Sequence, residues 1–122
     1  VTVEGLGAAE RIRAVCSLVF RACAEQRRLL QVILDYLDGA RKAVSDVEER
    51  VRRRTIRMRH ILAGLVIEGM RSGEFGKASV RDVNDALYAL IEAGIFRTVV
   101  LGRPEIDELD KAVERVLAGI RP

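Results

Sequence analysis

The side chains that could do chemistry are sparse in this sequence of 122 residues, and they form no catalytic or metal-binding pattern. His60 is the sole histidine, and no Cys-x-x-Cys or His-Glu-x-x-His spacing gives it metal-ligating neighbours. The ten glycines form no phosphate-binding loop. A lone histidine beside an apolar helical stripe is typical of a hydrogen-bonded structural residue, with a ligand contact as the alternative. We therefore expect no metal, no cofactor and no enzymatic activity.

Arginine is the one charged residue type that clusters, with six arginines between positions 50 and 59. Such a density could form a phosphate-binding face on a helix. Acidic side chains four positions earlier can pair with three of them on that helix. These pairs are Asp46–Arg50, Glu48–Arg52 and Glu49–Arg53. We interpret the cluster as a solvated, salt-bridged face, which leaves Arg54, Arg57 and Arg59 to solvent or a neighbouring domain, with DNA contact as the less favoured alternative.

The two cysteines predict free thiols. Cys16 and Cys23 lie seven positions apart in a predicted helix, so their Cα atoms are about 10 Å apart along its axis. This separation exceeds the ~7 Å limit for a disulfide. We expect both side chains to be buried as small hydrophobic groups. Free thiols, with no signal-peptide pattern at the start of the chain, favour a cytoplasmic protein.

Composition narrows the class of protein. Apolar residues make up 49% of the chain and charged residues 32%, and charge interrupts every apolar stretch well before the ~18 residues of a membrane span. Aromatic residues amount to 4% and tryptophan is absent, which argues against RNA-binding modules that stack bases on aromatic platforms. The net charge of +3 is too small to indicate nucleic-acid binding. The length predicts a single domain over residues 1–122.

Apolar residues recur every three or four positions from residue 8 to residue 120, and no segment alternates as a β-strand would. The pattern predicts an all-α fold, a single bundle of about five helices. The predicted helices span about 8–23, 26–38, 42–72, 79–101 and 104–119. The first two could form one 31-residue helix because no Pro or Gly separates them. A capping box at Ser45 and Glu48 allows the third to begin near residue 45, while Ser79 and Pro104 mark the starts of the last two.

Residues 65–75, LVIEGMRSGEF, resemble the C-terminal half of TetR-family transcriptional regulators, in which an aliphatic helix ends in a Gly-Glu-Phe-like turn. Three later stretches agree with this resemblance: SVRDVNDAL, LIEAGIF and the closing LAGIRP. The resemblance covers residues 8–122. It implies an effector-sensing and dimerisation domain that controls DNA binding by an N-terminal helix-turn-helix.

The helix-turn-helix itself is not expected within these residues. Residues 79–88 superficially echo its opening, but no turn residue occurs between Val80 and Ala93, so this stretch is one continuous helix. The chain begins with Val1 rather than methionine, and we expect it to be the C-terminal piece of a longer regulator that contacts DNA only through the missing part. The alternative is a stand-alone helical interaction or scaffold protein without a ligand. A coding sequence that extends upstream of Val1 would favour the regulator.

The resemblance also implies where the sites lie. A predominantly apolar small molecule would bind among the first four helices, and the last two would form a homodimer interface, a four-helix bundle across a two-fold axis. Small residues in the fourth helix, which allow helices to approach closely, support this interface. Our pocket candidates are Phe20, Tyr36, Met58, Leu62, Tyr88 and Glu92, each with simple core packing as the alternative. Our interface candidates are Ala86, Leu90, Ala93, Gly94, Leu109, Val113 and Val116.

Overall fold

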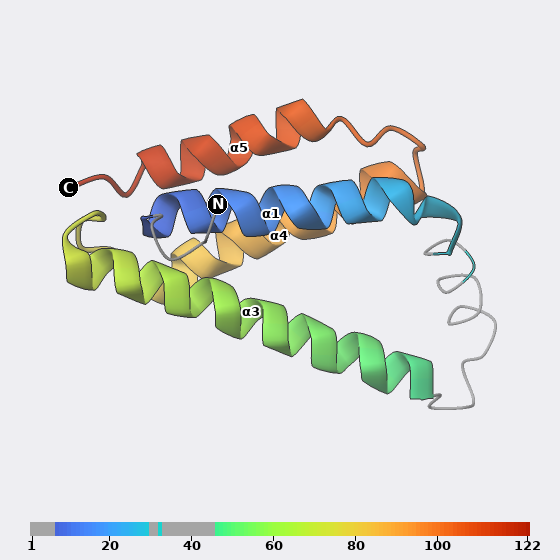
Figure 1. Cartoon of the computed structure of the whole chain (residues 1–122), viewed down its shortest axis with the longest axis horizontal. Coiled ribbons are helices and arrows are strands. Elements are labelled where there is room, and N and C mark those ends of the chain that lie inside the picture. Colours follow the sequence, from blue (N-terminus) through green and yellow to red (C-terminus); the bar gives the residue numbers. More distant parts are fainter. Residues whose placement is uncertain (1–6, 30–31, 33–45) are drawn as a thin grey trace.

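The computed structural model describes residues 7–29, 32 and 46–122, and this part of the chain is helical, with no strand. Its helices are α1 (Ala8–Glu25), α3 (Asp46–Ser72), α4 (Val80–Val99) and α5 (Ile106–Ala118). Figure 1 shows α1 between α5 and α3, with α4 behind it. The prediction of an all-α fold is confirmed. None of the described helices is long and apolar enough to cross a membrane.

Two of the predicted boundaries can be compared directly with α4 and α5. Ser79 caps α4 as predicted, because its hydroxyl accepts a hydrogen bond from the backbone N–H of Asp82 at 3.2 Å. The predicted start of α5 at Pro104 is wrong by two residues, and the helix begins at Ile106. The physical reason is Glu105, the N-cap, whose left-handed backbone (φ 44°) keeps the residues before it out of the helix.

The first half of the chain is described less completely. α1 ends at Glu25, with Gln26 as its C-cap, so the alternative of one 31-residue helix is wrong. The predicted helix over 26–38 lies mostly outside the described residues. So does the alternative helix start near Ser45, and α3 is described from Asp46 onward.

α1 forms the centre of the bundle. It packs against α3, α4 and α5, and α4 packs against α3 and α5 as well. The buried face of α1 consists of Ala8, Ile12, Cys16, Phe20 and Cys23, spaced three or four positions apart. The other helices contribute Leu62, Val66, Leu87, Ile91, Leu109, Val113 and Leu117 to the same core. Each large aliphatic side chain buried here contributes about 1.5–3 kcal/mol relative to exposure, so this seam determines how the helices pack.

Gly94 allows α4 to lie close to its neighbours. A Cβ atom built at Gly94 would lie 2.8 Å from Cδ1 of Phe20 and 3.2 Å from Cδ1 of Leu109. Both of these side chains are buried, with exposed fractions of 1% and 2%. The absence of a side chain at Gly94 is therefore explained by contacts within the protomer.

The turn after α3 begins with the Gly-Glu-Phe sequence of residues 73–75, in which each residue has a distinct physical role. Gly73 has a φ of 82°, a left-handed conformation that favours glycine and ends the helix. Phe75 is 4% exposed and packs over Gly69, where no space remains for a Cβ atom beside its ring. The turn thus folds back onto the last turn of α3.

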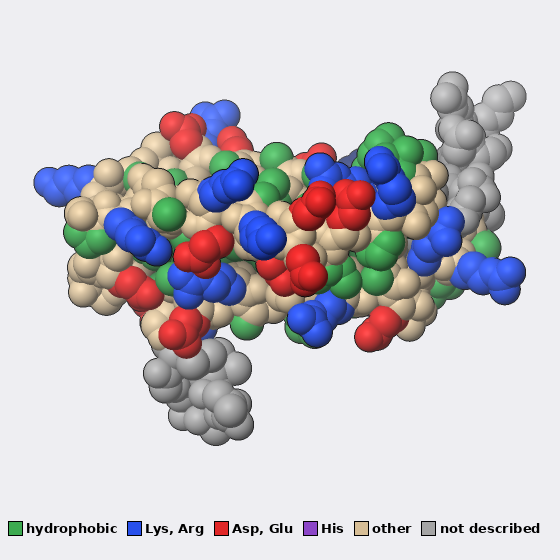
Figure 2. All heavy atoms as spheres, turned by 90° about the horizontal axis from the view of Figure 1, so that it is seen from above, with side chains coloured by type: hydrophobic (Ala, Val, Ile, Leu, Met, Phe, Trp, Pro, Cys, Tyr) green, Lys and Arg blue, Asp and Glu red, His purple; other side chains and the backbone are tan. Residues whose placement is uncertain are grey.

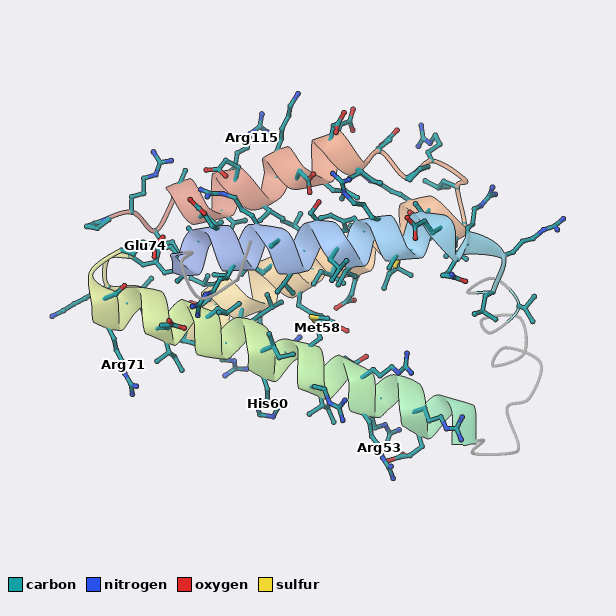
Figure 3. The ribbon with its side chains drawn as sticks, viewed as in Figure 1. Arg53, Met58, His60, Arg71, Glu74 and Arg115 are labelled. Carbon is teal, nitrogen blue, oxygen red and sulfur yellow. The ribbon has the colours of Figure 1, made fainter. Side chains whose placement is uncertain are left out.

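Glu74 connects this turn to the start of α1. Its carboxylate accepts hydrogen bonds from the backbone N–H of Ala8 at 2.7 Å and of Ala9 at 3.1 Å. The residue at the N-cap of α1 is Gly7, which has no side chain to accept these bonds. Glu74 therefore caps α1 from a position 66 residues away in the sequence, and Figure 3 shows it beside the N-terminal end of that helix.

Candidate functional site

The residues predicted to line a pocket are divided between the core and the surface. Phe20 and Leu62 are completely packed inside the bundle. Met58 and Tyr88 are half-buried against the same core, and Glu92 is exposed on α4. Tyr36 lies outside the described residues. A pocket that these residues complete together with the 26–38 segment stays a prediction.

Arg59 joins α3 to α4 by two interactions. Its guanidinium forms an ion pair with Asp85 and lies over the ring of Tyr88, 5.0 Å from the ring centroid. A cation over an aromatic face at this distance is stabilising. Arg59 was expected to meet solvent or another domain, and this expectation is wrong, because its partners come from α4 of the same chain.

A groove of about 530 Å³ runs beside this ion pair, between the middle of α3 and the start of α4. Its lining consists of Ile56, Arg59, His60, Ala63, Val80, Arg81 and Asn84. The volume lies within the ~300–1,000 Å³ range of small-molecule sites, which combine apolar walls with a few polar groups. In Figure 3, His60 points away from α1, whereas Met58, two positions earlier, points toward the other helices.

Asn84 is the buried polar residue in the lining of the groove. Asn84 is 8% exposed, and its Oδ1 atom is buried without a hydrogen-bond partner in the structure. A buried acceptor without a partner costs about 1–3 kcal/mol. Asn84 thus places a buried acceptor without a partner in the wall of the groove.

The sequence analysis did not predict this groove, although it gave His60 a ligand contact as the alternative to a hydrogen-bonded structural role. The structure places His60 exposed in the lining, with no hydrogen bond to another described residue. One further signal was present. Asn84 lies four positions after Val80 and three before Leu87, so it occupies a position in the apolar stripe of its helix. A polar residue at such a position indicates a buried hydrogen-bonding group. The neighbouring positions of α3 gave no signal, because only the packing of α3 on α4 brings Ile56 and Ala63 to the groove.

A second surface feature extends along the outer side of α4, away from the core. Side chains at spacings of three and four residues form one exposed or half-exposed apolar stripe, which we call the α4 stripe: Ala86, Ala89, Ala93, Phe96 and Val100. Phe96 is 54% exposed and Val100 is 59% exposed. A shallow groove between α4 and α5 adjoins it, lined by Leu90, Ala93, Arg97, Ala112 and Arg115 among others.

Comparison with known families decides the classification. The family model of the BetI-type transcriptional repressor C-terminal domain matches residues 8–122, which include all four described helices and the Gly-Glu-Phe turn. The chain belongs to this family. A search of curated proteins and a search of solved structures find no match. The expected membership of the TetR family is therefore confirmed: the chain is a C-terminal domain of the kind found in transcriptional repressors.

Within this family domain, the predicted interface residues lie in two environments. Ala86 is exposed, and Leu90, Ala93 and Val116 are half-exposed. The others, Gly94, Leu109 and Val113, are buried in the core of the protomer itself. A partner could therefore contact the first group directly, whereas the second group supports the helices from inside.

The arginine cluster of α3 is paired in part, as predicted. Arg53 donates to the Glu49 carboxylate at 3.4 Å. The side chains of Asp46 and Glu48, expected to pair with Arg50 and Arg52, are not among those that the structure describes.

On the face shown in Figure 2, viewed from the α5 side, basic and acidic side chains are interspersed. That face has no extended basic area of the kind that binds DNA.

The two cysteines are buried free thiols, as expected. Burial raises the pKa of Cys16 to about 12, with Asp110 adding to the effect, and burial also raises the pKa of Cys23. Both thiols are thus kept in the unreactive protonated form. Among the residues that the structure describes, no group of three His, Cys, Asp or Glu side chains could hold a metal ion.

Proposed function

We propose that this domain is the dimerisation and effector-sensing part of a TetR-like regulator, and that it dimerises through the α4 stripe together with the adjoining face of α5. The α4 stripe is the observation that carries the proposal. Its alanines have small side chains, which leave room for another helix to pack closely on the middle of α4. Phe96 and Val100 expose large apolar side chains at the C-terminal end.

A second copy of the chain is the partner that fits this surface. In a two-fold symmetric dimer, α4 of each copy packs on the stripe of the other, and small residues allow the helix axes to approach closely. One flanking charge, Arg97, is already paired within the protomer: it bonds Glu105 at 3.3 Å and approaches Glu108 at 3.7 Å. A partner that covers the stripe therefore need not neutralise this group.

Sedimentation of the 122-residue chain tests dimerisation. The wild type should be a dimer at micromolar concentration, and Ala93→Arg should be a folded monomer, because an unpaired charge buried in the interface costs several kcal/mol. Ala14→Arg is the matched control, since Ala14 is an exposed helical alanine on α1, a helix that contributes no residue to the stripe. A monomeric wild type, or equal effects of the two substitutions, would contradict the proposal.

The effector-sensing part has a competing hypothesis, a helical scaffold protein without a ligand. In the regulator, a small molecule that binds one helix arrangement better than another shifts the position of the DNA-binding segments joined to the domain. A tenfold preference biases that equilibrium by about 1.4 kcal/mol. Ligand binding raises the unfolding temperature in proportion to RT ln(1 + [L]/Kd), so a screen of apolar and amphipathic compounds by thermal unfolding distinguishes the two. A melting temperature that no compound raises would contradict effector sensing and favour the scaffold hypothesis.

A further inference from the structure

We infer that the groove between α3 and α4 is a binding site for a small amphipathic molecule that combines an apolar body, an anionic group and a hydrogen-bond donor. This inference deepens the effector-sensing part of the proposed function and rests on it for its biological role. The binding event itself does not depend on dimerisation or on DNA.

The apolar body is indicated by the walls of the groove. Ile56 is 48% exposed in the described structure, although a large aliphatic side chain gains from burial. Ala63 and Val80 continue this apolar surface across the two helices. A ligand that lies between them removes the exposed part of Ile56 from water.

The anionic group is indicated by the charges around the groove. Arg81 and His60 line it, and neither forms an ion pair or hydrogen bond with another described residue. The nearby carboxylate, Asp85, is already occupied by Arg59. The N-terminal end of α4, which starts at Val80, adds the positive end of a 20-residue helix dipole. Among the residues that line the groove, the charge without a partner is therefore that of Arg81, which is positive.

The hydrogen-bond donor is indicated by Asn84. Asn84 lines the groove, and its Oδ1 atom is buried and has no partner. A hydroxyl or amide N–H of the ligand would satisfy it once the Asn84 side chain turns toward the groove. This requirement is independent of the charge, because an anionic group without a proton cannot donate to Oδ1.

Four probes with related chains separate these requirements: octanoate, 3-hydroxyoctanoate, 1-octanol and octylamine. Their dissociation constants are measured by ¹H–¹⁵N chemical-shift titration of the 122-residue chain. Octanoate should bind about fivefold more tightly than 1-octanol and octylamine, and 3-hydroxyoctanoate should bind more tightly than octanoate. The shifts should map to residues 56–63 and 80–84.

Two substitutions assign the preferences to individual side chains. Arg81→Gln should weaken octanoate about threefold and leave 1-octanol unchanged, whereas Arg71→Gln, at an exposed arginine outside the groove, should change neither. Asn84→Leu should remove the advantage of 3-hydroxyoctanoate over octanoate. It should also raise the unfolding temperature, because it replaces a buried unsatisfied amide with an apolar side chain.

Three results would overturn the inference: no preference for the anionic probe, equal effects of Arg81→Gln and Arg71→Gln, or shifts that map elsewhere. Binding that maps to another part of the domain would overturn this groove while leaving effector sensing intact. If no probe binds, the groove is not an amphipath site, and the sedimentation of the same samples still reports independently on dimerisation.

Discussion

Removal of the Glu74 carboxylate should destabilise the start of α1, although the residue lies in a turn between two other helices. Two backbone N–H groups of α1 donate to this carboxylate, at 2.7 and 3.1 Å. Gly7, the N-cap, has no side chain that could replace it. Glu74→Ala therefore leaves both donors without a protein partner.

The magnitude follows from the role of the contact as a helix cap. Loss of an N-cap side chain costs about 0.5–2 kcal/mol. The negative charge at the helix N-terminus contributes about 0.3–1 kcal/mol more. We expect Glu74→Ala to lower the free energy of unfolding by about 2 kcal/mol, which corresponds to a decrease of about 8 °C in the melting temperature of a domain of this size.

The assay is urea unfolding followed by circular dichroism, performed in the Ala93→Arg background, which we expect to be monomeric, so that dimerisation does not contribute. Glu68→Gln is the control, because Glu68 is an exposed partner of Arg11 at 3.2 Å and its loss should cost less than about 1 kcal/mol. Both substitutions remove one carboxylate from the same end of the molecule. Their difference isolates the capping contact.

A double-mutant cycle with Gly7→Ser makes the test specific. In the wild type, a Cβ atom at Gly7 would lie 2.8 Å from Oε1 of Glu74, so Gly7→Ser alone should be destabilising. In the Glu74→Ala background that space is free, and the serine can cap α1 locally and recover about 1 kcal/mol. Additive effects of the two substitutions, or a Glu74→Ala protein as stable as the wild type, would refute the capping role.

Three further predictions concern the core and the surface. Gly94→Ala should destabilise the domain by about 1 kcal/mol, because overpacking against the Phe20 ring outweighs the gain in helix propensity. Gly64→Ala should stabilise the domain by a similar amount, because no atom lies within 4 Å of the new Cβ atom. Thermal unfolding measures both effects. Cys16, with its pKa raised to about 12 by burial, should react with a disulfide reagent at pH 8 only after unfolding. A hydrogen bond from Arg13 lowers the pKa of Glu114. This partly exposed pair therefore stabilises the fold above the unfolded pKa of the carboxyl group, and the stabilisation is lost as the pH falls through the lower folded pKa. Glu114→Gln should flatten this acid dependence of the free energy of unfolding by less than about 1 kcal/mol, measured by urea titrations across pH 3–6.

The helices could be predicted because their signals are local. The apolar spacing of α4, its Ser79 cap and the glycine that ends α3 all act within a few residues. The start of α5 could not be placed exactly, because the left-handed conformation of Glu105 is not encoded in a residue type that favours it. The capping of α1 by Glu74 could not be predicted either, since 66 residues separate donor and acceptor.

The sequence by itself determined the all-α class, the family resemblance and the buried state of the two cysteines, because periodicity, turn residues and hydrophobicity are properties of short segments. Only the tertiary structure decided which members of each apolar stripe face the core. Gly94, Leu109 and Val113 share their helices with the α4 stripe and the α5 face, yet they are buried, since α1 packs against both helices and covers that side. The groove beside Asn84 likewise exists because α3 and α4 meet there, and no single segment of the sequence contains both of its walls.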